Sequence, residues 1–367
     1  MATKNADLKD LIATTLPDLP DQYFEVTWDN QDYEFCRIYQ TERMMVDGGE
    51  SITRKVMLDD TGNARYRRAF DTDEPSIGEV VHTINVPWCQ IGTHYSWDKI
   101  EIMRNKSPKG FLDLLKTRRI DGLWSLANLI ENRAWKTPNN STDDLNPYGV
   151  PYYINMLDAD STTAGFNGQT IRYQDGTTGT ACAGLDAATY DKWRNYAGVY
   201  TAVNNDLLKT IRKAFLLTRF KAPLFINDPA QKRTAAKRFY ADADTVIELQ
   251  DLADARDDNH SGKDVLGNIR VDDTGLVMIN RLPVQYIPQL NGVTDPVTGD
   301  ATSPIYCINF EKFIPYIQDG YWMEEGEPES GGITQHTTFT VFLDGAHNNL
   351  CVNRREAGFV LHKPITS

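Results

Sequence analysis

The chain has 367 residues, of which 41% are hydrophobic and 24% charged, and its formal net charge at pH 7 is −13. This apolar content excludes a disordered chain, which needs fewer apolar residues. The negative charge argues against a dedicated nucleic-acid binder, because such proteins gain affinity from Lys and Arg on phosphates. No window approaches 18 apolar residues, so we expect no membrane span and no membrane partner.

The N-terminus has no basic start followed by an apolar run, so the sequence predicts no signal peptide. The cysteines are widely spaced and form no CxxC pair. They are Cys36, Cys89, Cys182, Cys307 and Cys351. We interpret them as scattered reduced thiols, not as disulfides or a metal site. These features favour a protein that is made and used in the cytosol.

Residues 1–40 have few helix-forming features beyond a short segment at 7–15, which two prolines end. Residues 1–50 contain eleven acidic and four basic residues, for a net charge of −7. Aromatic residues, among them Trp28 and Tyr33, are interspersed. The segment is either a frayed terminus or, since aromatics argue against plain disorder, an arm that lies on another surface.

Residues 51–70 are predicted to form a β-hairpin, with strands at 52–58 and 64–70 about a turn at 59–63. Five basic and two acidic residues give it a net charge of +3. The basic residues are Arg54, Lys55, Arg65, Arg67 and Arg68. A polar two-stranded ribbon is not stable alone in water, so we expect it to need a neighbour. The alternative is a solvated surface hairpin.

The longest helical pattern runs from Ser107 to Pro138. Ser107 can cap its start, and Pro138 ends it. Apolar residues recur near the 3.6-residue period and predict one dry face. They are Phe111, Leu112, Leu115, Leu123, Trp124, Ala127, Ile130, Ala134 and Trp135. Such a rod would be about 45 Å long. Its central Arg118 and Arg119 could bind phosphate, but we favour structural salt bridges with Asp121 or with a neighbour's arm.

The stretch at 79–97 is rich in β-forming residues, with Pro87 at an edge or a bulge. After a Pro- and Asn-rich loop, the remaining chain indicates mixed α and β structure. Helices are predicted at 186–195, 204–220 and 244–255, the last capped by Asp244 or Thr245. Strands are predicted at 223–226, 238–241, 276–279, 282–288 and 305–310. The last sixty residues predict two alternating strands about a turn at 344–348.

No catalytic or nucleotide-binding signature rises above chance. His94 near Cys89 could serve a thiol nucleophile, but packing or surface positions on a strand explain both better. The acidic residues at 324–327 are read as chance neighbours in an acidic chain, not as a general acid/base pair. The polar run at 254–264 fails the EF-hand spacing and indicates a solvated turn. We therefore predict no enzyme, no cofactor and no metal.

The sequence contains a charged arm, a hairpin and a long helix, but no cluster of polar residues that could form a catalytic site. This combination favours a protein that assembles with copies of itself. The −7 arm would meet the +3 hairpin and the +4 helix region (106–137) of sister subunits. The candidate inter-subunit contacts are Arg54, Arg65, Arg67, Arg68, Arg118, Arg119, Trp28 and Tyr33.

The order of these parts resembles the tailed-bacteriophage major capsid proteins, with the fold named after phage Hong Kong 97. Five strings carry the resemblance, which covers about residues 80–360. They are HTINVPWCQIGTHYSWD at 82–98, LLKTRRIDGLWSLANLIENRAW at 114–135, GLDAATYDKWRNYAGVYTAVNNDLLKTIRKAF at 184–215, LPVQYIPQL at 282–290 and NNLCVNRREAGF at 348–359.

The resemblance implies an α+β capsid fold in five parts. These are an N-terminal arm at 1–40, an extended β-hairpin loop at 41–95, a peripheral domain with the spine helix at 96–150, an axial domain at 151–300, and final peripheral strands at 301–367. It also implies a structural shell protein, with no enzymatic activity.

The implied function is a subunit that self-assembles into hexamers and pentamers of an icosahedral phage head. The head would be assembled in the host cytoplasm and enclose double-stranded DNA without sequence-specific binding. Portal and decoration proteins are implied partners. The chain reaches the arm directly from Met1, so we expect a separate scaffold or none, and no Lys–Asn cross-link. Two alternatives stay open: the shell of an encapsulin-like cellular nanocompartment, and an enzyme whose site is assembled from distant residues.

Overall fold

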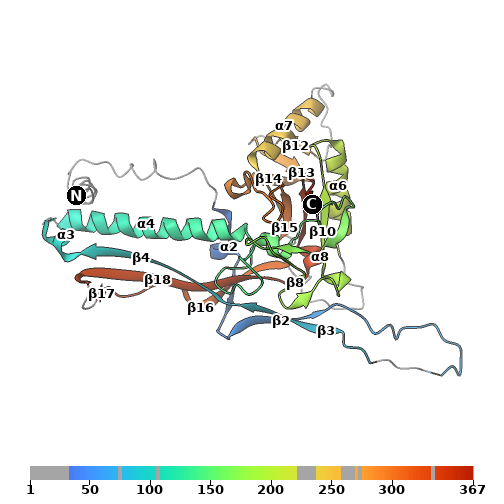
Figure 1. Ribbon diagram of the computed structural model, residues 1–367, viewed down its shortest axis with the longest axis horizontal. Helices are drawn as coiled ribbons and strands as arrows, with labels where there is room; N and C mark the ends of the chain where they lie inside the picture. Colours follow the sequence, from blue (N-terminus) through green and yellow to red (C-terminus); the bar gives the residue numbers. More distant parts are fainter. Residues whose placement is uncertain are drawn as a thin grey trace. The chain divides into compact units, whose positions relative to one another are not determined.

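The computed structural model describes residues 33–72, 77–104, 108–220, 237–257, 269–271, 275–331 and 335–366 (Figure 1). These residues form two compact units. Unit 1 combines the described parts of Met1–Gly48, Gln90–Asn132 and Ile317–His347; unit 2 combines those of Gly49–Cys89, Arg133–Tyr316 and Asn348–Ser367. Each unit is therefore built from three segments that are distant in sequence. No helix in the described residues is both long and apolar enough to cross a membrane.

Unit 1 is organised by a long helix and a sheet. The described strands of the sheet run in the order β1 (Met44–Val46), β16 (Phe313–Glu325), β18 (Gln335–Cys351) and β17 (Glu329–Gly331), and β4 (Cys89–Asp98) also pairs with β18. A short helix, α3 (Lys99–Arg104), precedes the long helix α4 (Pro108–Ala134). A Cβ added at Gly122 of α4 would lie 3.6 Å from Thr93 Oγ1, so α4 packs directly on β4 (Figure 1).

The long helix predicted at 107–138 is confirmed, with its last turn shorter than expected. The helix ends at Ala134, and the backbone N–H of Lys136 bonds to the Arg133 carbonyl at 3.2 Å. A Cβ at Gly149 would collide with the carbonyl oxygens of Ala134 and Lys136. Only a residue without a Cβ, glycine, lets the following loop approach the carbonyl groups at the end of the helix this closely.

The buried side of α4 differs in part from the predicted apolar face. Leu123 was expected on that face but is 36% exposed, whereas Leu126, which was not expected there, is buried. Ile130 and Ala134 are buried as predicted. The shift arises because α4 is covered by two elements, β4 and the helix α2, so its buried surface is not one narrow stripe.

Helix α2 (Glu34–Thr41) lies where the sequence predicted an arm without a core. Phe35, Ile38 and Tyr39 are buried in unit 1, so that expectation is wrong for these residues. The buried Glu131 carboxylate of α4 accepts a hydrogen bond from the Phe35 N–H at 2.8 Å and satisfies one donor of the first turn. Any arm deletion intended to test assembly should therefore end before α2. The predicted short helix at 7–15 lies outside the described residues.

Unit 2 is built on a mixed sheet of eight described strands. Their order is β12 (Ile269–Val271), β13 (Val277–Ile279), β14 (Leu282–Tyr286), β11 (Lys237–Ala241), β15 (Ile305–Asn309), β19 (Gly358–His362), β10 (Asn195–Val199) and β5 (Gly165–Gly168). The predicted strands at 238–241, 276–279, 282–288 and 305–310 are confirmed, each within a few residues. The predicted strand at 223–226 lies outside the described residues.

Helices α6 (Asn205–Leu217) and α7 (Ala243–Asp257) cover one face of this sheet. Register places Val284, Phe239, Cys307 and Phe359 on the same face of four neighbouring strands. Phe215 of α6 contacts the rings of Phe239 at 5.4 Å and Phe359 at 5.5 Å. Helix α7 contacts β12, β13 and β14, at the other end of the sheet. Both helices therefore pack on one shared core.

The predicted helix at 204–220 is confirmed, and Asn204 caps it by accepting hydrogen bonds from the N–H groups of Asp206 and Leu207. The helix predicted at 244–255 is also present, but its predicted cap is wrong. The Asp242 carboxylate accepts the Thr245 N–H at 3.1 Å, so the cap lies two residues before Asp244.

The predicted helix at 186–195 is wrong. The chain forms β8 (Ala181–Cys182), β9 (Leu185–Asp186), a 3₁₀ turn η2 (Asp191–Trp193) and then strand β10. The Asp186 carboxylate accepts hydrogen bonds from the Ala188 N–H and the Thr189 hydroxyl. These local bonds offer the backbone an alternative to a helix. The remaining short elements of unit 2 are α5 (Val150–Tyr153), β6 (Ile171–Arg172), β7 (Thr178–Gly179), η4 (Pro288–Leu290) and α8 (Arg354–Ala357).

The predicted hairpin has a different partner strand. β2 (Ser51–Met57) pairs with β3 (Val81–Pro87) in a two-stranded antiparallel ribbon, and no described residue at 64–70 is in a strand. The ribbon closes with a hydrogen bond of 3.3 Å from the Leu58 N–H to the Val80 carbonyl. The described residues between Leu58 and Val80, 59–72 and 77–79, therefore belong to a loop at the end of the ribbon and not to one of its strands.

The predicted turn at 344–348 is also wrong, because β18 runs unbroken through it. Gly345 lies within the strand, and glycine suits this position because a Cβ there would come within 3.1 Å of the Trp322 ring. Asn348 and Asn349 are buried and bond to the backbone of Tyr148. The polar residues at this point satisfy buried backbone groups and do not form a turn.

Candidate inter-subunit surfaces

The loop between Leu58 and Val80 carries three of the candidate arginines, Arg65, Arg67 and Arg68. Every described side chain from 59 to 72 is exposed. The exposed residues include large apolar ones: Tyr66, Phe70 and Ile77 are fully exposed. Local bonds shape the loop, such as the one from the Arg68 N–H to the Asp71 carboxylate at 2.8 Å. The described loop residues are therefore not covered by any described part of their own subunit, and apolar exposure on this scale typically marks an interaction surface.

The two strands of the ribbon, in contrast to its loop, have buried side chains and a hydrogen bond to another segment of unit 2. On one side of the ribbon, Ile52 faces Val86 and Arg54 faces Ile84. The side chains of Ile52, Ile84 and Val86 are buried. Arg54, another candidate contact, donates a hydrogen bond to the Tyr316 hydroxyl at 2.9 Å. This anchor fixes the root of the ribbon.

Arg118 and Arg119 of α4 form ion pairs within unit 1. Arg118 bonds to Glu101 at 2.8 Å and to the Ser96 carbonyl at 2.5 Å. Arg119 forms a two-pronged pair with Glu325, with Nε–Oε1 at 3.0 Å and Nη2–Oε2 at 2.9 Å. The Arg119 bonds lower the pKa of the Glu325 carboxyl, so this residue stays ionised. The preferred salt-bridge interpretation is confirmed, but the partners are Glu101 and Glu325, not Asp121.

Tyr33 also bonds within unit 1. Its hydroxyl accepts the Trp124 indole N–H at 2.7 Å and donates to the Asn128 amide oxygen at 3.0 Å. Trp28 lies outside the described residues. The inter-subunit role of all eight candidate residues stays a prediction. In the structure, Tyr33, Arg118 and Arg119 form hydrogen bonds or ion pairs within unit 1. The loop arginines, Arg65, Arg67 and Arg68, are exposed.

The features considered for catalysis show little reactive chemistry. Burial raises the pKa of the Cys89 thiol to about 12, so the nucleophilic thiolate is scarce at neutral pH. The Cys89 thiol instead bonds to the Asp144 carbonyl at 3.4 Å. The ion pair with Arg119 keeps Glu325 ionised, so its carboxyl group has no proton to donate as a general acid. No group of three or more His, Cys, Asp or Glu residues within the described ranges could hold a metal ion.

A cavity of about 370 Å³ opens in unit 2, with Trp135 and Tyr306 in its wall. Asp295 is the one carboxylate among the described lining residues. It accepts hydrogen bonds from Arg172 Nη1 at 2.6 Å and from the Thr298 N–H at 2.9 Å. The wall therefore offers an ion pair, without a second carboxylate beside it for acid/base chemistry.

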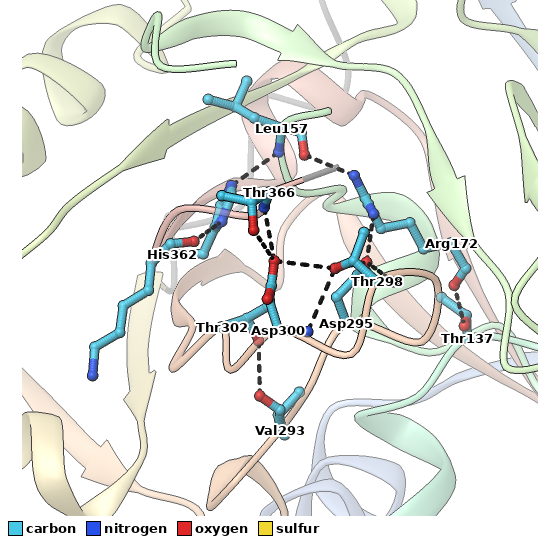
Figure 2. A network of polar contacts seen from close by, with 11 residues as sticks. Thr137, Leu157, Arg172, Val293, Asp295, Thr298, Asp300, Thr302, His362 and Thr366 are labelled. Carbon is cyan, nitrogen blue, oxygen red and sulfur yellow. Dashed lines mark hydrogen bonds and ion pairs between the residues drawn. The ribbon is translucent and has the colours of Figure 1, made fainter. Parts of the chain in front are cut away.

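Figure 2 shows how this ion pair continues into a network that holds the C-terminal segment. Arg172 Nη2 donates to the Leu157 carbonyl at 3.3 Å, and the Leu157 N–H donates to His362 Nε2 at 3.0 Å. The Asp300 carboxylate accepts the Thr366 N–H at 2.7 Å, which lowers the pKa of that carboxyl. The network joins the loop at 293–302 to the last residues of the chain.

His362 must be neutral in this network. Its Nε2 accepts a hydrogen bond, so Nδ1 carries the proton and donates to the Lys363 carbonyl at 2.7 Å. Burial, assisted by repulsion from Arg172, lowers the pKa of His362 to about 4. The unfolded chain therefore binds one more proton than the folded chain between about pH 6.5 and 4. The stability due to neutral His362 is complete above pH 6.5 and is lost as the pH falls toward 4.

Replacing His362 with glutamine should reduce the acid sensitivity of the subunit. We expect the wild-type protein to lose up to about 3 kcal/mol of unfolding free energy through this residue between pH 7 and pH 4, and the variant to lack that loss. Thermal or denaturant unfolding at both pH values measures it. His94→Gln, at an exposed position, is the matched control and should keep the wild-type response. An equal loss in His362→Gln and wild type would contradict the assignment.

Comparison with known proteins gives no match by sequence and clear matches by structure. No protein-family model and no curated protein matches the chain. Solved structures that resemble it include capsids. The cyanophage A-1(L) capsid asymmetric unit superposes with a TM-score of 0.62 at 13% identity, covering 96% of this chain and 97% of that one.

Two further structures agree. The capsid of a native GTA particle matches with a TM-score of 0.52 at 9% identity, covering 96% of this chain and 95% of that one. The capsid of Myoviridae phage XM1 matches with a TM-score of 0.50 at 10% identity, covering 92% and 94%. The chain therefore has the α+β capsid fold that the sequence predicted.

Proposed function

We propose that the chain is the structural subunit of a phage capsid shell. One observation carries the proposal: the match to the cyanophage A-1(L) capsid spans nearly the whole of both chains, so both units and the ribbon are included. A likeness confined to one unit would support only a shared domain. The exposed loop between Leu58 and Val80 supports the proposal independently, because no described part of the subunit covers Tyr66, Phe70 or Ile77.

The finer assembly follows from the same proposal. Subunits form the hexamers and pentamers of an icosahedral head, which encloses double-stranded DNA through confinement and counterions, consistent with the net charge of −13. A portal protein, a separate scaffold and decoration proteins are the expected partners. Assembly takes place in the host cytoplasm, and the mature protein is located in the virion.

Electron microscopy of the purified protein, with and without its co-expressed genomic neighbours, tests the proposal. We expect closed shells with five-fold vertices. Protein that stays monomeric at every concentration and in every co-expression would overturn the proposal. Shells that enclose an enzyme and not DNA would instead favour a cellular nanocompartment.

A further inference from the structure

Two helices of unit 2 present exposed faces of opposite charge. On α6 and just after it, four basic side chains and one acidic side chain are exposed, for a net charge of +3. They are Lys209, Arg212, Lys213, Arg219 and Asp206. Among the described side chains of α7, the exposed charged ones are all acidic. They are Asp244, Glu248, Asp251 and Asp254. We call these sets the basic face and the acidic face.

Each face is a single stripe along its helix. The basic face follows spacings of three and four residues through Lys209, Arg212 and Leu216, with Lys213 next to Arg212 and Arg219 just after the helix ends. The acidic face follows spacings of three residues through Glu248, Asp251 and Asp254. Each stripe also contains an exposed aliphatic residue: Leu216 is 76% exposed and Ile247 is 54% exposed. An aliphatic residue among charged ones matches, on a small scale, the apolar core and polar rim of a protein–protein interface.

The sheet order places the two stripes at opposite ends of one unit. Helix α6 packs near β10 and β19: Thr210 lies beside Gly198 of β10, and Phe215 contacts Phe359 of β19. Helix α7 packs on β12, β13 and β14. β13, β14, β11, β15 and β19 lie between β12 and β10 in the sheet, and both helices pack on the same face of it. One subunit therefore presents a positive end and a negative end.

This polarity fits one occupant in particular, a second copy of this chain. Opposite charges attract across an interface and fix the orientation of the partners, whereas like charges penalise wrong docking. A contact between two different surfaces of identical subunits leaves one surface of each kind unused on the growing assembly. Repetition of such a contact closes a ring when the rotation between copies allows it.

We propose that the basic face of α6 in one subunit docks on the acidic face of α7 in the next subunit around the ring. Leu216 and Ile247 lie within the contact and exclude water between the charged side chains. The inference rests on the proposed function, because rings of subunits are the hexamers and pentamers of a shell. It adds the pair of surfaces that joins neighbouring copies within a ring.

A charge-exchange experiment tests the pairing. In the first variant, Lys209→Glu, Lys213→Glu and Arg219→Glu reverse the basic face. In the second, Glu248→Lys, Asp251→Lys and Asp254→Lys reverse the acidic face and leave the first turn of α7 unchanged. In the third, both sets are combined. The matched controls keep the charges: Lys209→Arg with Lys213→Arg, and Glu248→Asp with Asp251→Glu.

We expect each single reversal to raise the critical concentration for assembly by about tenfold or more at low salt, because three opposed pairs become like-charged. The effect should shrink at high salt, where screening acts over a few ångströms. The combined variant should regain most of the wild-type assembly. Circular dichroism of each soluble variant establishes that it has folded.

The outcomes separate this inference from the proposed function. If the wild type forms shells and both single reversals assemble like the wild type, the pairing is wrong and the proposed function stands. If single reversals block assembly and the combined variant remains blocked, each face meets some other partner, and the pairing is again wrong. If the wild type itself never assembles, the proposed function fails and the pairing fails with it.

Discussion

Replacing Arg354 with methionine is expected to lower the free energy of unfolding of the subunit by about 3–5 kcal/mol, the usual cost of removing one partner from a buried charged network. The Arg354 side chain is completely buried in unit 2. Its guanidinium donates to the carbonyls of Tyr153 and Trp193, both at 2.8 Å, and to the Gly168 carbonyl at 3.3 Å. A fourth bond of 3.1 Å reaches the amide oxygen of Asn195.

These acceptors belong to α5, β5, η2 and β10, so one side chain joins four segments of unit 2. Methionine has a similar length but no donor, and it would leave three backbone carbonyls in a dry site without their hydrogen bonds. Lysine keeps the charge but cannot reproduce the planar fork of donors. We therefore expect Arg354→Lys to be destabilising as well.

The neighbouring Arg355 provides the matched control. It lies partly exposed, stacks over the Phe166 ring at 4.8 Å and donates to the Asp191 carbonyl at 3.0 Å. Arg355→Met should cost about 1 kcal/mol or less, as partly exposed interactions usually do. Denaturant unfolding of the unassembled subunit measures all three variants. An unfolding midpoint of Arg354→Met equal to that of Arg355→Met would contradict the role assigned to Arg354.

Removing the loop of the ribbon is expected to abolish shell assembly while leaving the subunit folded. The design joins Leu58 to Val80 through an Asn-Gly turn. The existing bond from the Leu58 N–H to the Val80 carbonyl matches the closing pair of a two-residue hairpin, so the register of β2 and β3 is retained. The described loop residues bury no side chain, so their removal takes nothing from the core.

We expect the unfolding midpoint of the loopless variant to stay within about 2 °C of the wild type, because its core is unchanged. Its sedimentation profile should show soluble subunits without closed shells. Normal shells from this variant would remove the loop from the inter-subunit contacts. A lower unfolding midpoint would show that the loop stabilises its own subunit.

A charge variant separates the contribution of the arginines from that of the apolar residues in the loop. Arg65→Glu, Arg67→Glu and Arg68→Glu together should block assembly at low ionic strength, since surface attraction is screened over about 10 Å at 0.1 M salt. The corresponding lysine variants keep the charge and should assemble. Unchanged assembly of the glutamate variant would leave Tyr66, Phe70 and Ile77 as the contacts that matter.

The candidate surfaces were only partly accessible from the sequence. The loop arginines were recognised because charge reverses sharply between residues 1–50 and 51–70. The sequence could not show that α6 and α7 lie at opposite ends of one sheet, because that depends on the strand order and not on any local pattern.

The structural role of Arg354 could not be predicted from the sequence. Arg354 and Arg355 are adjacent and chemically identical, and nothing in their neighbours distinguishes them. In the structure, α8 begins at Arg354 and aims the two side chains in different directions. One enters a dry site lined by carbonyls, and the other reaches a ring at the surface.

The sequence by itself determined the elements that depend on local periodicity and capping. Helices α4 and α6 were predicted with their starts within about one residue, because a helical period and, for α4, a capping serine before a proline act over a few residues. The capsid fold was implied by the resemblance of five sequence strings and of the order of these parts to a known family, and the structure confirms it.

Only the tertiary structure decided which strands pair and which polar residues are buried. β2 pairs with residues 81–87 and not with 64–70, and β18 runs straight through a string that has the composition of a turn. Strand pairing depends on contacts between distant segments, and the hydrogen bonds that stabilise Asn348 and Asn349 come from Tyr148, about 200 positions away in the chain. Local composition cannot reveal partners that only packing brings together.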